Sequence, residues 1–168
     1  GFSEECHTLM NLFREQLESY KKKIGIEKAE STYRGLVADY KNLLLFMKSK
    51  KNTEDIVIEE LEKSFIEDYY NWMLGTCALA NSTAFGRVNT LKWLMYIAQE
   101  KGWIRVHPFA SFECMPEYKR RSFLSEEELQ RIIRIELRYK RQRAMRDMFL
   151  FMCFTGLSYA DLKTITYA

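Results

Sequence analysis

The feature that most constrains the fold is a run of helical periodicity over residues 81–102. Its apolar side chains recur at spacings of three and four, which places them on one face of a helix. They are Ala84, Val88, Leu91, Met95 and Ala98. Asn81 and Ser82 can cap the first turn, and Gly102 supplies a stop at the other end. We therefore expect a helix over residues 81–101 with one buried face.

Three further amphipathic segments precede this helix, over residues 4–22, 31–49 and 58–74. The third has an acidic exposed side, which carries Glu59, Glu60, Glu62, Glu67 and Asp68. The whole chain of 168 residues contains only seven Gly and two Pro, so few residues interrupt its helices. These features predict an all-α fold that begins with a four-helix bundle of about 100 residues.

The composition changes after residue 110. Residues 111–122 contain Pro116 and the cationic cluster Lys119-Arg120-Arg121, and are predicted to form a basic linker. We therefore expect a first domain over residues 1–110, the linker, and a second unit over residues 123–168.

The second unit opens with a helix start. Ser125 and Glu128 fit a capping box ahead of an apolar periodic stretch. A second apolar stretch covers residues 144–155 and ends at Gly156, while Cys153 is expected to be a core thiol. The periodicity leaves open whether these stretches are two helices or one continuous helix.

The charge of the chain is unevenly placed. Its net charge is only +3, yet residues 119–146 hold ten basic and four acidic side chains. Such a segment on a nearly neutral protein favours a polyanionic partner. A solvated helix surface explains the same distribution equally well, so charge alone does not decide between them.

The helix expected at residues 81–101 has a polar outer face without acidic residues. Thr83, Arg87 and Thr90 share one ridge, with Asn89 and Lys92 further round. Short hydroxyls, amides and cations suit a groove of nucleic acid. A solvated face on an ordinary bundle helix is the competing interpretation, and this pattern by itself favours that one.

The helix expected at residues 31–49 offers a second polar turn. Ser31, Thr32 and Arg34 lie at its amino end, where hydroxyls, backbone amides and charge can reach phosphates. Thr32 and Arg34 are therefore candidate DNA contacts.

Several classes of protein are excluded. No run of about eighteen apolar residues exists, so no membrane span is expected. Glu4 and Glu5 stand where a secretory signal would be basic. The four cysteines, which include Cys6 and Cys77, are far apart, and this favours a reducing, cytoplasmic compartment, with Cys77 a core thiol. Cys6-His7 lacks convergent partners for zinc, so no metal is expected.

The segment Thr155-Gly156-Leu157-Ser158-Tyr159-Ala160-Asp161-Leu162 resembles the opening box of the tyrosine recombinase (phage integrase) family, whose usual form is Thr-Gly-Leu-Arg-x-x-Glu-Leu. Residues 120–129 resemble the start of that family's catalytic domain. The bundle before them resembles its SAM-like core-binding domain, with His107-Pro108-Phe109 standing for Asn-Pro-Phe. The overall sequence is similar to integrases of Bacteroides-type mobile elements.

The resemblance implies that a full-length parent performs site-specific recombination through a 3′-phosphotyrosine intermediate, without a cofactor. It implies a core-site DNA duplex as partner, further protomers in a tetramer on that DNA, and a bacterial cytoplasmic location. The chain would comprise a four-helix SAM-like bundle, a linker and the first helices of an incomplete α+β catalytic domain. On this resemblance, the expected DNA contacts are Thr32, Arg34, Thr83, Arg87, Lys92, Lys119, Arg120 and Arg121.

One position departs from the family pattern. Ser158 stands where most members have their first catalytic arginine, which stabilises charge on the scissile phosphate. A serine supplies a hydrogen bond but no charge, and we favour compensation by another basic residue over an impaired parent. The family's later Lys, His-x-x-Arg box and nucleophilic Tyr have no counterpart here, so the chain is expected to bind DNA without cutting it. The alternative is a catalytically dead regulatory or protein-interaction module derived from an integrase.

Overall fold

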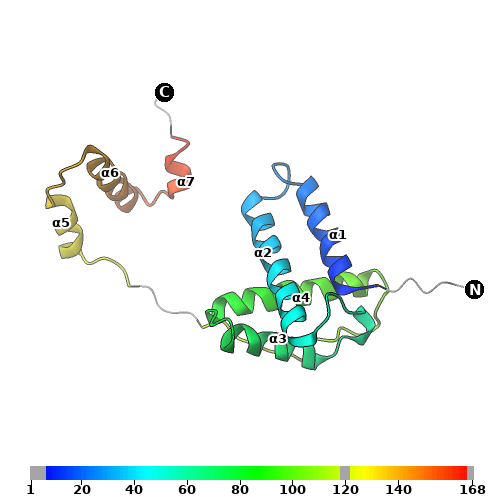
Figure 1. Ribbon diagram of the computed structural model, residues 1–168. Helices are drawn as coiled ribbons and strands as arrows, with labels where there is room; N and C mark the ends of the chain where they lie inside the picture. The colour runs from blue at the N-terminus through cyan, green and yellow to red at the C-terminus, as the bar shows by residue number, and fades with distance from the viewer. Residues whose placement is uncertain (1–6, 118–121, 166–168) are drawn as a thin grey trace, which may run out of the picture. The chain divides into compact units, whose positions relative to one another are not determined.

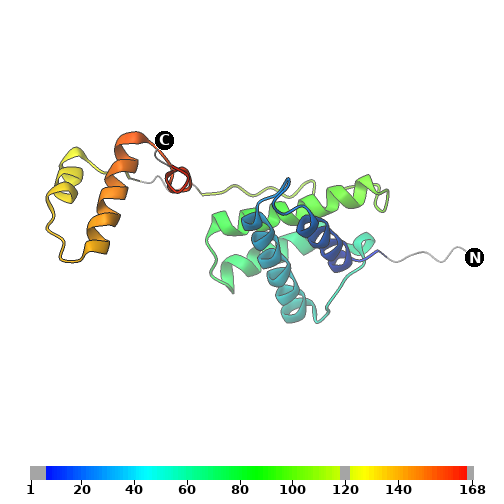
Figure 2. The ribbon, with the colours of Figure 1, turned by 90° about the horizontal axis from the view of Figure 1, so that it is seen from above.

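Two helical hairpins build the amino-terminal part of the protein. The computed structural model describes residues 7–117 and 122–165, and the chain divides into two units, Gly1–Tyr118 and Lys119–Ala168. In the first unit, α1 (Leu9–Lys22) pairs with α2 (Glu30–Phe46), and α3 (Lys63–Gly75) pairs with α4 (Asn81–Glu100). The α1–α2 hairpin projects from the layer formed by α3 and α4 (Figure 1). Figure 2 shows the same bundle from above.

Two expected helix starts are wrong for one shared reason. Thr8 is extended and forms an antiparallel bridge with Val57. On either side of this bridge, the Leu9 amide donates to the Ile56 carbonyl and the Ile58 amide donates to the His7 carbonyl. This pairing delays α1 until Leu9. It also leaves a short 3-10 turn at Ile58–Glu60, so α3 begins at Lys63 rather than near Ile58.

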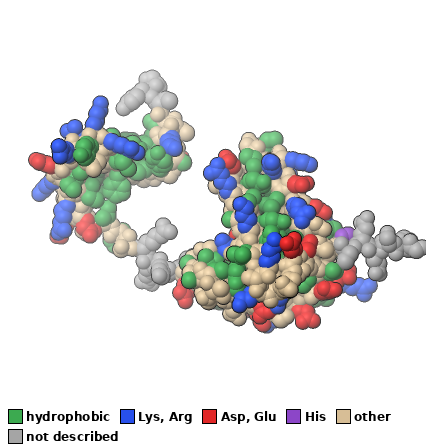
Figure 3. Space-filling model, viewed as in Figure 1, with side chains coloured by type: hydrophobic (Ala, Val, Ile, Leu, Met, Phe, Trp, Pro, Cys, Tyr) green, Lys and Arg blue, Asp and Glu red, His purple; other side chains and the backbone are tan. Residues whose placement is uncertain are grey.

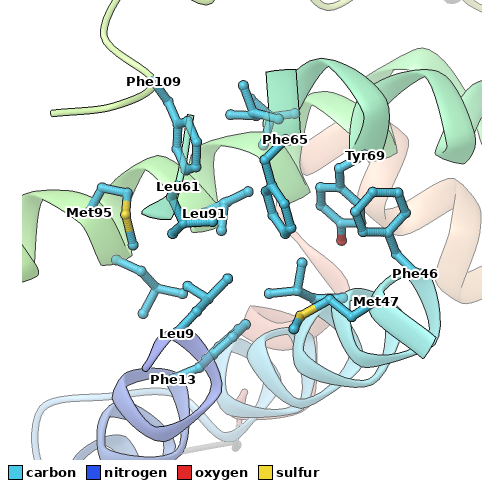
Figure 4. Close-up of a cluster of buried hydrophobic side chains, with 14 of the residues drawn as sticks. Leu9, Phe13, Phe46, Met47, Leu61, Phe65, Tyr69, Leu91, Met95 and Phe109 are labelled. Carbon is cyan, nitrogen blue, oxygen red and sulfur yellow. The ribbon is translucent and has the colours of Figure 1, made fainter. Parts of the chain in front are cut away.

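The predicted apolar stripe of α4 is buried in the hydrophobic core. All five of its side chains are at most 2% exposed. Phe46 at the end of α2 packs against three aromatic side chains of α3. Its ring centroid lies 5.5 Å from that of Phe65, 5.1 Å from that of Tyr69 and 5.4 Å from that of Trp72 (Figure 4). Truncating a buried Phe of this kind costs about 3–5 kcal/mol. Many aromatic side chains of the chain are therefore buried together in the core.

The α1–α2 hairpin is less deeply buried toward its tip. Leu43 of α2 is 2% exposed, whereas Tyr40 and Leu36, one and two turns earlier, are only partly covered. Lys and Arg side chains lie on both flanks of this hairpin, with apolar side chains between them (Figure 3). A five-residue π-helical turn, Met47–Lys51, extends α2 to the left-handed residue Asn52.

The second unit holds separate helices, which answers the question left open by the sequence. These are α5 (Glu126–Arg134), α6 (Lys140–Thr155) and α7 (Tyr159–Leu162). Ser125 caps α5 through the predicted capping box, since its Oγ accepts from the Glu128 amide at 3.2 Å and its own amide donates to Glu128 Oε2 at 2.8 Å. Gly156 ends α6 in the left-handed region, at φ +71°.

No residue between 122 and 165 is fully buried. Cys153 is exposed, so the expectation of a core thiol at this position is wrong, because only α5 packs against α6. Across both described stretches, the secondary structure is helical without a strand, which confirms the all-α prediction. Within those stretches, no helix has the length and apolarity to cross a bilayer.

Candidate nucleic-acid interface

A row of exposed cations follows the outer face of α2 and its π-helical extension. Arg34, Lys41 and Lys48 are spaced by seven residues, which is about two helical turns or roughly 10 Å for each step. All three are exposed. We call Arg34, Lys41 and Lys48 the α2 cationic stripe.

The ion pairs of this stripe are weak. Arg34 Nη2 lies 2.6 Å from Glu30 Oε1, and Lys48 Nζ lies 2.9 Å from Glu54 Oε1. All four side chains are about half exposed or more, so each pair contributes little and a stronger anion can replace the carboxylate. Lys41 makes no ion pair with any residue that the structure describes. The stripe can therefore accept phosphates.

Neutral polar groups lie at the amino ends of α2 and α4. Thr32 is exposed in the first turn of α2, and Thr83 is exposed in the first turn of α4. Gly86 and Asn89 continue the exposed side of α4. None of these four residues is acidic.

Arg87 is placed differently from expectation. Its side chain is 16% exposed and faces Asp39 of α2, with Arg87 Nε 3.4 Å from Asp39 Oδ1. Thr90 Oγ1 donates a 2.7 Å hydrogen bond to Asp39 Oδ2. In the free chain, Arg87 is therefore a link between α2 and α4 and is not available as an exposed cation. A direct contact of Arg87 with DNA stays a prediction.

Burial affects both charged groups of the link between Asp39 and Arg87. Burial raises the pKa of the Asp39 carboxyl, and the Thr90 hydrogen bond and Arg87 offset part of that effect. The Nε and Nη1 atoms of Arg87 are buried without a hydrogen-bond partner in the part of the chain that is described. Tyr69 lies beside this group, where its hydroxyl donates to Asn42 Oδ1 at 2.8 Å and burial raises its pKa.

Lys92 also contacts its own protein. Its Nζ donates to the carbonyl of Phe112 and lies 5.8 Å from the centre of the Phe112 ring. The side chain is half-buried, and its contact with DNA stays a prediction. Its partner belongs to the segment of residues 107–117 that follows α4, which we call the strap.

Ser158 has a local structural role. It is the N-cap of α7, where its Oγ donates to Asp161 Oδ2 at 2.6 Å and accepts from the Asp161 amide at 3.3 Å. The hydroxyl and the backbone amide of Ser158 both donate to Asp161 Oδ2, and these two hydrogen bonds lower the pKa of Asp161. Lys119, Arg120 and Arg121 lie outside the described residues.

His107, a possible catalytic or metal-binding side chain, has a structural role. His107 is buried in the strap, where its Nε2 lies 3.1 Å from the Lys92 carbonyl and its Nδ1 accepts from the Phe109 amide at 3.1 Å. The described residues contain no cluster of three His, Cys, Asp or Glu side chains that could hold a metal ion.

The α2 cationic stripe is the feature that motif-based reasoning missed. Its cations were visible in the sequence as a spacing of seven within an amphipathic segment. The acidic side chains Glu59, Glu60 and Glu62 lie exposed just before or at the start of α3 instead. Exposed positive charge therefore lies along α2 and its π-helical extension, whereas exposed negative charge gathers just before α3.

Comparison with known proteins identifies the bundle and the strap together. A family model described as "Phage integrase SAM-like domain" matches residues 8–118. The match spans α1 to α4 and the strap. No curated protein and no solved structure matches the chain.

Proposed function

Because the chain belongs to the phage integrase SAM-like domain family, we propose that its bundle binds double-stranded DNA as the core-binding part of a site-specific tyrosine recombinase. The observation that carries this proposal is the α2 cationic stripe, three exposed cations on one helix face. Cations spaced along a helix can neutralise successive phosphates of a duplex and release condensed counterions. Affinity should therefore fall steeply as salt rises.

The bundle divides the work of recognition between charge and neutral polar groups. Arg34, Lys41 and Lys48 supply phosphate contacts that set the position of the protein on the duplex. Thr32 and Thr83 supply hydroxyls that can bond to phosphates or base edges. Arg87 acts indirectly, because it pairs with the Asp39 carboxylate and so links α4 to α2.

The finer assignments rest on the resemblance to tyrosine recombinases. We assign residues 1–110 to the core-binding domain and residues 123–168 to the start of a catalytic domain. Residues 111–122 are assigned to a linker whose first part, as far as Glu117, packs on the bundle and whose Lys119, Arg120 and Arg121 contact phosphates. The box from Thr155 to Leu162 supports the assignment of the catalytic domain. A full-length parent of Bacteroides type would break and rejoin DNA through a 3′-phosphotyrosine, as a tetramer in the bacterial cytoplasm.

A second candidate function is favoured by the surface of the second unit. Phe151 is 45% exposed and Phe154 is 69% exposed, and apolar side chains gather on the face of this unit seen in Figure 3. Exposed aromatic side chains of this kind can bind a protein. The chain would then be a regulatory module derived from an integrase, and its duplex binding would be weak and independent of the α2 cationic stripe.

The experiment measures binding of the whole chain to the parent's core-site duplex by fluorescence anisotropy, from about 50 to 300 mM salt. The test variant replaces Arg34, Lys41 and Lys48 with Gln. A matched control removes the same charge elsewhere, by replacing Lys51, Lys63 and Lys101 with Gln. We expect the test variant to lose about 0.9 in the salt slope for each phosphate contact removed. Equal binding by both variants would refute the assignment of the stripe.

A further inference from the structure

The strap runs back along α4 in the opposite direction. Near its start, His107 bonds to the carbonyl of Lys92, and at its end the amide of Glu117 donates to Asn81 Oδ1 at 2.9 Å. Residue numbers therefore rise along the strap while they fall along α4. Figures 1 and 2 both show the segment after α4 returning toward the start of that helix.

Two phenylalanines fasten the strap to the core. Phe109 is fully buried, and its ring is stacked at 6.4 Å from Phe65 of α3. Phe112 is 8% exposed and meets Tyr70 edge-on at 5.7 Å. Burial of two aromatic side chains makes this part of the strap a fixed component of the bundle.

Asn81 holds the last described residue of the strap. Its Nδ2 donates to the Tyr70 hydroxyl at 2.8 Å, while its Oδ1 accepts from the Glu117 amide. One amide side chain thus joins α3, the first residue of α4 and the strap. The expectation that Asn81 or Ser82 caps α4 is wrong, because Ala80 is the N-cap and no side chain caps the helix.

We infer that Asn81 is a positioning residue that pins the end of the strap to the amino end of α4, and so fixes where the basic linker leaves the bundle. Lys119 follows Glu117 by two residues, a reach of about 7 Å for an extended chain. The consequence for DNA binding rests on the proposed function.

Hydrogen exchange of the full chain tests the pin without DNA. In Asn81→Ala, the amide of Glu117 should exchange about tenfold faster than in the wild type, while amides in the interior of α4 stay protected. Tyr70→Phe keeps the bond from Glu117 to Asn81 and should give a smaller increase. Asn71→Ala, an exposed Asn of α3, serves as the matched control and should change nothing. Equal exchange of Glu117 in the wild type and in Asn81→Ala would overturn the pin.

Duplex binding then tests the positioning role. Asn81→Ala should bind roughly three- to tenfold more weakly with an unchanged salt slope, because preorganisation is lost but no phosphate contact is removed. Loss of Glu117 protection together with wild-type affinity would overturn the positioning role and leave the proposed function intact. A wild-type chain that fails to bind any duplex would instead refute the proposed function, while the exchange data still decide the pin.

Discussion

Asp39 of α2 and Arg87 of α4 join the two hairpins of the bundle, with Arg87 Nε 3.4 Å from Asp39 Oδ1. Both side chains are at most 20% exposed, so the ion pair is screened less than the surface pairs of the bundle. The positive charge of Arg87 is balanced by the neighbouring carboxylate. Arg87 therefore adds no uncompensated charge to the surface of the bundle.

Removing Arg87 should destabilise the bundle. Arg87→Met keeps much of the side-chain volume but leaves the Asp39 carboxylate partly buried without its cation, at a cost of about 1–3 kcal/mol. Urea unfolding followed by tryptophan fluorescence measures this, because Trp72, Trp93 and Trp103 all lie in the first unit. Adding Asp39→Asn to Arg87→Met should recover more than half of the lost stability. A double variant no more stable than Arg87→Met would contradict the coupling.

Asp39 should make stability depend on pH. Its folded pKa is raised above 3.8, chiefly by burial, so the folded state binds its proton more tightly than the unfolded state. The resulting stabilisation is fully present below the unfolded pKa and is lost as pH rises through the folded pKa. The free energy of unfolding of the wild type, relative to Asp39→Asn, should therefore fall from about pH 4 upward and then level off. A constant difference across that range would contradict the shift.

Lys41 is the best single probe of the proposed interface. Lys41→Gln removes an exposed charge that no described carboxylate pairs with, so its effect on folding should be small. Duplex affinity should fall roughly two- to fivefold at low salt, and the salt slope should shrink by about 1. Lys63→Gln on α3 is the control, since Lys63 is also exposed and pairs with Glu67 at 3.3 Å. Equal losses in the two variants would show a non-specific charge effect.

The sequence predicted what depends on local periodicity and capping. The buried face of α4, the capping box at Ser125 and the stop at Gly156 all follow from spacing within one helix, and the structure confirms each of them. The start of α1 was misplaced because Leu9 bonds to Ile56, a contact between residues far apart in the chain. Local patterns carry no information about such pairing.

The candidate site was less predictable than the fold. Arg87 and Lys92 lie on the polar side of α4, yet whether a polar side chain meets solvent or a neighbouring element depends on packing between elements. Arg87 pairs with Asp39 of α2, and Lys92 donates a hydrogen bond to the Phe112 carbonyl of the strap. Lys41 and Lys48 stayed unassigned because no motif marks them, although their spacing with Arg34 was available.

Ser158 should matter for the local order of α7. Ser158→Ala removes both hydrogen bonds of the Ser158 hydroxyl with Asp161 and leaves the one that the amide of residue 158 donates to Asp161 Oδ2. Residues 158–162 should therefore exchange amide hydrogens faster while α6 is unchanged. Lowering the pH below the depressed pKa of Asp161 should weaken the same cap in the wild type, because a protonated carboxyl accepts from Ser158 more weakly than the carboxylate does. Ser158→Thr keeps the hydroxyl and serves as the control. Unchanged exchange in Ser158→Ala would show that the cap does not order this turn.

The chain should bind a nicked suicide duplex without forming a covalent adduct. A tyrosine attacks a phosphate efficiently only when cations stabilise the transition state, and Ser158 supplies none at the position of the family's first catalytic arginine. Tyr159 is the tyrosine adjacent to that position and is 53% exposed, and its ring lies 4.7 Å from Lys163 Nζ. Denaturing gel electrophoresis with labelled DNA should therefore show free DNA alone, while anisotropy confirms binding in the same sample. An adduct would contradict the inactivity, and its disappearance in Tyr159→Phe would identify the attacking group.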